Sequence, residues 1–198
     1  MNIIFVKHGE LYSSDHVNLL YNKLSIYYPH AIFWCYTENP YNICSEVNII
    51  PVLIKPTLKK WWNKLALFSN DMPFEGECLF FDLDMEIISD PSSFITDYTK
   101  LTIINAYYKN ELCFEHHAYN VKINSSIIAW THGGQQHIWD KFLINKDYYM
   151  RKYAGIDRFL VHENIMINTF KDGIVNSVAN KLYENAPVNM YNGISYSL

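Results

Sequence analysis

The chain has 198 residues, of which 49% are hydrophobic and 18% charged, and its net charge is −4. This composition is typical of a globular protein with a substantial core, here one domain over residues 1–198, and excludes a disordered or low-complexity chain. The negative charge argues against general binding to DNA or RNA phosphates, which requires a face dense in lysine and arginine.

The predicted elements alternate between strands and helices. In chain order they are a strand at 2–6, a helix at 13–28, strands at 31–36 and 47–53, a helix at 59–69, strands at 77–81, 100–107 and 124–130, and a helix at 135–145. The first helix begins at serine N-cap candidates and spaces Val17, Leu20 and Leu24 along one face. Strands separated by helices indicate an α/β fold with a largely parallel core.

Two aspartates follow the apolar strand 77–81. Asp82 and Asp84 stand one residue apart, so the two-residue period of an extended segment places their side chains on the same side. Ligands in such sheets collect at the carboxyl ends of the strands. A pair of carboxylates there suits Mn²⁺ or Mg²⁺, which commonly bridges protein carboxylates to substrate phosphates. The alternative to a metal site is that the two aspartates are caps or ion-pair partners, because a D-x-D without further motifs also occurs by chance.

Several segments resemble, in order, those of the GT-A glycosyltransferases, in particular glycogenin-like and galactosyltransferase-like families and small glycosyltransferases of bacteriophages and bacteria. The segments that carry this resemblance are FVKHGELYSSDHVNLLYNKL, FWCYTEN, WWNKLALFS, ECLFFDLDMEIISDPSSF, INSSIIAW and YAGIDRFLVHENI. The resemblance covers nearly the whole chain. It implies the GT-A fold, a Rossmann-like mixed sheet flanked by helices.

The resemblance also implies roles for residues that bind a nucleotide-sugar donor. Asp82 and Asp84 match the D-x-D that holds a metal on the donor diphosphate, and Lys64 matches a basic residue directed at the donor phosphate or sugar. Lys7 and Tyr12 fall where the family recognises the base and ribose. The structural alternatives are a solvated helix lysine at 64, a charge at a strand end and an aromatic residue in a loop.

Three polar residues and one aspartate match positions that face the transferred sugar. Asn124, Ser125 and Ser126 correspond to the family's NSG or NSS, and their amide and hydroxyl groups suit recognition of sugar hydroxyls. Asp157 corresponds to the aspartate of a G-D-Q segment that contacts the reacting sugar in retaining members. Arg158 stands where the family has glutamine, which leaves a salt-bridged structural aspartate as the competing interpretation. Ordinary turn chemistry is the alternative for residues 124–126.

Some family features are missing from the sequence. Residues 191–198 stand where many members continue into a segment with a histidine ligand and a lid, so water, substrate or another residue is expected as the third metal ligand. The histidines at 116, 117, 132 and 137 lack the spacing of a zinc site. Gly133 and Gly134 form no phosphate loop, because no Lys-Ser/Thr follows, and are expected to end one strand and open the next helix.

The expected location is the cytoplasm, or the host cytoplasm if the gene is viral. The four cysteines, at 35, 44, 78 and 113, form no CxxC pair and lie in apolar surroundings, which indicates a reducing compartment. Residues 1–10 are too short an apolar run for a signal peptide, and no stretch approaches the length of a membrane span. Abundant Asn, Ile, Lys and Tyr suit a bacteriophage or a low-GC host.

The function implied by the resemblance is metal-dependent transfer of a sugar from a nucleotide-diphosphate donor, expected to be a UDP-sugar. The acceptor would be a hydroxyl of a glycan, a protein or a modified nucleic-acid base, with retention of configuration if the chain follows glycogenin-like members. One alternative is a non-catalytic nucleotide-sugar-binding module. A second is a phosphohydrolase of the haloacid dehalogenase type, whose D-x-D usually lies near the start of its fold.

Overall fold

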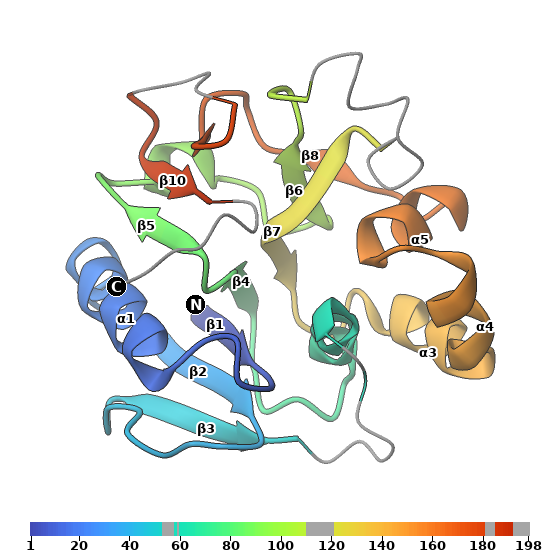
Figure 1. Ribbon diagram of the computed structural model, residues 1–198, viewed down its shortest axis with the longest axis horizontal. Helices are drawn as coiled ribbons and strands as arrows, with labels where there is room; N and C mark the ends of the chain where they lie inside the picture. The colour runs from blue at the N-terminus through green and yellow to red at the C-terminus, as the bar shows by residue number, and fades with distance from the viewer. Residues whose placement is uncertain (53–57, 59, 110–120, 181–184, 192–198) are drawn as a thin grey trace.

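A computed structural model gives the structure of the protein and describes residues 1–52, 58, 60–109, 121–180 and 185–191. Its centre is a seven-stranded sheet (Figure 1). The strands of this sheet are β1 (Asn2–Lys7), β2 (Ile32–Thr37), β3 (Val47–Pro51), β4 (Glu77–Phe81), β6 (Thr102–Asn105), β7 (Ile123–Thr131) and β8 (Asn168–Thr169). They lie side by side in the order β3-β2-β1-β4-β7-β6-β8.

The sheet is mixed, and its strand β7 runs opposite to the others. Strands β3, β2, β1 and β4 are parallel, whereas β7 runs antiparallel to both of its neighbours, β4 and β6. The carboxyl ends of β4 and β6 therefore meet the amino end of β7 at one edge of the sheet. This arrangement confirms the predicted mixed α/β fold and departs from a purely parallel core only at β7.

Helices cover the two faces unequally. The helix α1 (Ser14–Tyr27) lies on one face, and the helical segments η1 (Lys60–Phe68), α3 (Gln136–Ile144), α4 (Lys146–Lys152) and α5 (Ile156–His162) gather on the other (Figure 1). A short turn, η2 (Ser92–Phe94), follows the D-x-D region. None of the described helices is long and apolar enough to cross a membrane.

Strand alternation divides the core between these faces. In β4, Leu79 and Phe81 pack with α1, while Cys78 and Phe80 pack with η1 and the later helices. Because both faces are covered, the strand reads as a continuous apolar run. All four of these side chains are completely buried.

A second, three-stranded sheet follows directly from the D-x-D. It consists of β5 (Met85–Ile87), β10 (Val188–Met190) and β9 (Val175–Ser177), in the order β5-β10-β9. Glu86 of β5 accepts hydrogen bonds from the Asn189 amide at 3.0 Å and the Tyr191 hydroxyl at 2.9 Å. These strands of three residues are too short to show a period, which explains why the sequence did not predict them.

The helix predicted at 59–69 forms as a 3₁₀ helix over Lys60–Phe68, with residue 59 outside the described part. Every residue from Trp62 to Phe68 is buried, so this segment has no solvent-facing stripe to favour the α period. The buried Asn63 side chain donates to the carbonyls of Leu58 and Lys60 at 2.8 and 2.9 Å, which fixes the first turn. In a 3₁₀ helix residues three apart eclipse one another.

The other predictions agree with the structure to within a few residues. Helix α1 has Ser13 as its N-cap and buries Val17, Leu20 and Leu24, and the strand predicted at 77–81 has the observed bounds. The strand predicted at 100–107 spans Thr102–Asn105, and the one predicted at 47–53 ends at Pro51. Gly133 and Gly134 lie in the turn between β7 and α3, as predicted.

Two adjacent tryptophans give a test of this packing. Trp62 is 4% exposed and stacks on Phe142 at a centroid distance of 5.4 Å, whereas Trp61 is 44% exposed. We expect Trp62→Ala to lower the free energy of unfolding by about 3–5 kcal/mol, because it leaves a cavity between η1 and α3. The matched control Trp61→Ala should lower it by less than about 1 kcal/mol. Urea titrations compare the two, and equal losses would contradict the packing described.

Candidate active site

The D-x-D lies at the carboxyl end of β4, as predicted. The backbone N–H of Asp82 donates to the carbonyl of Ser126 at 2.8 Å, which extends the β4–β7 ladder by one bond. Leu83 is buried, and Asp82 and Asp84 on either side of it are partly exposed. The carbonyl of Asp84 accepts from the Tyr191 N–H at 3.1 Å. Both aspartates are thus held by backbone contacts with neighbouring strands.

Lys64 reaches the first aspartate from η1. Its ammonium Nζ lies 2.6 Å from Asp82 Oδ2 and also donates to the carbonyl of Ser125 at 3.2 Å. The side chains of Lys64 and Asp82 are 9% and 22% exposed, so water screens this pair little. The alternative of a solvated helix lysine is therefore wrong. The ion pair joins η1, β4 and β7 at one point.

The residues at the start of β7 bring Asp157 to the same place. The backbone N–H of Ser125 donates to Asp157 Oδ1 at 3.1 Å, and that of Ser126 donates to Asn124 Oδ1 at 2.8 Å. Ser125 and Ser126 are buried. One hydrogen-bonded cluster thus joins Lys64 to residues that lie far from it in sequence. These residues are Asn124, Ser125 and Ser126 of β7 and Asp157 of α5.

Asp157 is oriented by β7 rather than by the arginine that follows it. No ion pair joins Asp157 to Arg158 among the contacts of the described residues, and the Arg158 Nε is buried without a hydrogen-bond partner there. Burial raises the pKa of the Asp157 carboxyl, while the Ser125 hydrogen bond and the charges of Lys64 and Lys109 oppose that rise. The interpretation of Asp157 as a salt-bridged partner of Arg158 is not supported.

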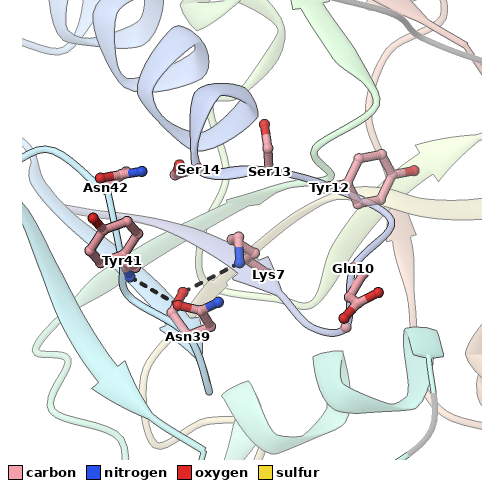
Figure 2. Close-up of a pocket in the computed structure, with 9 residues that line it drawn as sticks. Lys7, Glu10, Tyr12, Ser13, Ser14, Asn39, Tyr41 and Asn42 are labelled. Carbon is pink, nitrogen blue, oxygen red and sulfur yellow. Dashed lines mark hydrogen bonds between the residues drawn. The ribbon is translucent and has the colours of Figure 1, made fainter.

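Lys7 and Tyr12 line a separate pocket of about 250 Å³, which opens between β1, the start of α1 and the loop after β2. Figure 2 shows Lys7 at the floor of this pocket, where its Nζ donates to the carbonyl of Asn39 at 3.3 Å. Tyr12 lies at the opposite side from Asn39 and Tyr41. Ser13 and Ser14 complete the rim at the start of α1.

Tyr12 links this pocket to the D-x-D. Burial raises the pKa of its hydroxyl, and the negative charges of Asp84 and Asp82 raise it further, which places the ring near both carboxylates. Tyr12 thus lies in the lining of the pocket and also near the D-x-D. The nine residues that the sequence predicted fall in two neighbouring groups, with Lys7 and Tyr12 at the pocket and the other seven around the D-x-D and the start of β7.

The structure also places Tyr108, which the sequence analysis did not single out, near Asn124 and Asp157. It follows the carboxyl end of β6, which pairs with the start of β7 through Ile104 and Asn124. Nothing in the spacing of the adjacent tyrosines Tyr107 and Tyr108 marks either of them as functional. Its position depends on the irregular register between β6 and β7, which only the folded sheet reveals.

The donor atoms fit a hard divalent cation. Two carboxylates on alternate residues at a strand end match the ligands that Mg²⁺ and Mn²⁺ take beside water and phosphate. Within the described residues no group of three or more His, Cys, Asp or Glu side chains is placed to hold a metal. A cation bound by Asp82 and Asp84 would therefore need further ligands besides these two side chains. His132 and His137 lie in and after the turn that follows β7, and His116 and His117 lie outside the described residues, as does Cys113.

The raised pKa of Asp157 predicts a specific pH dependence of stability. Because the folded carboxyl binds its proton more tightly than the unfolded one, folding stability falls as pH rises above the usual value near 3.8. Asp157→Asn keeps the acceptor for Ser125 and removes the titration. We expect its free energy of unfolding, relative to the wild type, to increase between pH 4 and pH 7 in urea titrations.

Asp97→Asn is the matched control with the opposite sign. Hydrogen bonds from Thr99 lower the pKa of Asp97, so the stability that this carboxylate contributes is present above its usual pKa and is lost on acidification. The Asp97→Asn variant should therefore lose stability relative to the wild type as pH rises. Parallel slopes for the two variants would contradict the environment assigned to Asp157.

No protein-family model and no curated protein sequence matches the chain. Solved structures do. The galactosyltransferase LgtC in complex with donor and acceptor sugar analogues matches over 98% of this chain and 87% of its own, at a TM-score of 0.67 and 10% identity. The glycosyltransferase GlyE of Streptococcus pneumoniae TIGR4 matches over 98% of this chain and 55% of its own, at a TM-score of 0.67 and 13% identity.

An active-site mutant of LgtC matches at a TM-score of 0.64 and 11% identity, over 98% of this chain and 88% of its own. The chain therefore spans most of the length of LgtC but little more than half of GlyE. At these identities the likeness is one of fold. The chain has the GT-A fold of glycosyltransferases, as the resemblance in its sequence predicted.

Proposed function

We propose that the protein is a glycosyltransferase that moves a sugar from a nucleotide-diphosphate donor, a UDP-sugar, to an acceptor hydroxyl. The observation that carries this proposal is the cluster in which Lys64 contacts both Asp82 and Ser125 while Ser125 contacts Asp157. It stands at the strand edge where a sheet of this kind binds ligands. The GT-A fold supports the same activity.

In this proposal the two parts of the site bind the two ends of the donor. The 250 Å³ pocket receives the base and ribose, with Lys7 and Tyr12 in its lining. Asp82 and Asp84 would hold Mn²⁺ or Mg²⁺ on the diphosphate, and such a cation, when bound, stabilises charge on a departing phosphate as a Lewis acid. Tyr12, beside both parts, stands where the ribose would join the diphosphate.

The chain's own residues orient the reacting groups. Lys64 holds the Asp82 carboxylate in place and adds a positive charge beside the diphosphate. Asn124 and Asp157 offer an amide and a carboxylate to sugar hydroxyls, and the buried backbone of Ser125 fixes the carboxylate. Retention of configuration is inferred by analogy with glycogenin-like enzymes alone.

The two alternatives differ in what would be observed. A non-catalytic module would bind the donor at this site without releasing the sugar. A phosphohydrolase of the haloacid dehalogenase type would hydrolyse simple phosphate esters, and the fold gives that reading no support. Product analysis with UDP-sugars, together with a generic phosphate ester, distinguishes all three.

The proposed bridge between carboxylates and diphosphate predicts metal-dependent binding. Isothermal titration with UDP-galactose and with UDP-glucose should give a much higher affinity in Mn²⁺ than in EDTA. The reason is that the diphosphate meets two carboxylates, which repel it unless a cation lies between them. Equal affinity in both buffers would overturn the bridging role of Asp82 and Asp84.

The second aspartate tests the same role without changing the shape of the site. Asp84→Asn removes one negative charge, so metal-dependent transfer should fall by at least ~100-fold, or about 2.7 kcal/mol of transition-state stabilisation. Its melting temperature should stay close to that of the wild type. The control Asp147→Asn, at an exposed position on α4, should leave both quantities unchanged. An unstable but fully active Asp84→Asn protein would mean that Asp84 is a structural residue.

A further inference from the structure

Two consecutive tyrosines after β6 differ in how their hydroxyls are satisfied. The Tyr107 hydroxyl donates to the carbonyl of Val175 and accepts from the N–H of the same residue, which ties it to the second sheet. The Tyr108 hydroxyl is buried, and it makes no hydrogen bond of normal geometry with any other described residue. Its side chain is only 2% exposed. The Tyr108 hydroxyl is therefore a buried polar group without a well-formed hydrogen bond among the described residues.

An unpartnered buried hydroxyl is costly. Withdrawing such a group from water without a replacement bond destabilises a fold by about 1–3 kcal/mol, and phenylalanine in the same place would avoid the cost. Native structures contain few such groups, and each calls for a physical explanation. A ligand that supplies the missing partner is one explanation, provided that the hydroxyl faces a binding site.

The surroundings of Tyr108 meet that condition. Its neighbours include the Asn124 side chain and the carboxylates of Asp157 and Asp84, and these two negative charges add to the effect of burial in raising the pKa of its hydroxyl. The Asn124 side chain lies close enough to favour the ionised form of the Tyr108 hydroxyl, but no hydrogen bond of normal geometry joins the two, and Asn124 Oδ1 also accepts from the Ser126 N–H. The hydroxyl thus lies among the residues proposed to face the transferred sugar.

Hydrogen-bond acceptors and donors both lie around this point. Asp157 and Asp84 offer carboxylate oxygens, and a tyrosine hydroxyl can donate one hydrogen bond and accept another. A partner that satisfies all of them must carry several hydroxyls close together, as a pyranose ring does. Sugar hydroxyls can donate to the Asp157 carboxylate, whereas phosphate oxygens would meet its negative charge, so a sugar suits the place beside Asp157 better than the diphosphate does.

We propose that Tyr108 is a sugar-binding residue, whose hydroxyl pairs with a hydroxyl of the transferred sugar beside Asn124 and Asp157. This inference rests on the proposed function. Tyr108 contacts the sugar part of the donor and neither the base nor the diphosphate. Its hydroxyl lowers the stability of the free protein and contributes to recognition of the donor.

The test is Tyr108→Phe, with binding measured for UDP and for UDP-galactose or UDP-glucose, whichever sugar donor the wild type binds more tightly in Mn²⁺. We expect a melting temperature equal to or above that of the wild type. The affinity for UDP should not change, while the affinity for the UDP-sugar should fall by about five- to tenfold, the value of one lost hydrogen bond.

Tyr28→Phe is the matched control. The Tyr28 hydroxyl is also buried without a partner among the described residues, but it follows the carboxyl end of α1, near Tyr98 and Asp90 and away from the D-x-D. This variant should not lose stability either, and it should bind UDP and the UDP-sugar as the wild type does. A loss of UDP-sugar affinity in both variants would overturn the assignment of Tyr108, since it would show a general effect of the substitution.

Two further results are distinguishable. If Tyr108→Phe binds UDP and the UDP-sugar with wild-type affinities, Tyr108 does not contact the sugar, although the proposed function stands. If the wild type binds neither UDP nor a UDP-sugar, the proposed function fails and the assignment of Tyr108 fails with it. A lower melting temperature of Tyr108→Phe would show that the hydroxyl has a partner within the protein.

Discussion

The largely buried ion pair between Lys64 and Asp82 is the interaction on which the candidate site depends. It connects a 3₁₀ helix on one face of the sheet with the end of its central strand, at 2.6 Å. A buried pair of this kind adds little net stability when both partners are present, but removing one leaves a charge without compensation. The pair therefore acts mainly to define a geometry, in which one lysine fixes a carboxylate and, through Ser125, the start of β7.

The antiparallel direction of β7 brings further polar residues next to this ion pair. Because β7 runs antiparallel to β4, its first residues lie beside the carboxyl end of β4 instead of at the opposite edge. Asn124, Ser125 and Ser126 come next to the D-x-D for this reason alone, and Ser125 then positions Asp157 of α5. A purely parallel sheet would have separated these residues by the length of a strand, about 3.3 Å for each residue.

Much of this arrangement could be predicted from local patterns. The strand 77–81 is an apolar run with a sharp polar end, and the helix at Ser14–Tyr27 has a cap and a regular apolar face. The position of the D-x-D could be predicted because its two aspartates directly follow an apolar strand in the sequence. The roles of Lys64 and Asp157 came from the resemblance and not from spacing, since their contacts with Asp82 and Ser125 depend on the tertiary fold. Tyr108 could not be predicted, because burial without a partner is a property of the packed structure.

The second sheet has a consequence for how the protein acquires its site during synthesis. Asp84 opens β5, and β5 finds its neighbour only in β10, so the backbone that carries this carboxylate is completed by residues made about a hundred positions later. A domain generally folds as a unit, and β10 is among the last described residues of this chain. The backbone contact of Asp84 with Tyr191 can form only after Tyr191 has been synthesised. A chain that stops before β10 would thus lack the backbone contacts that order the second aspartate.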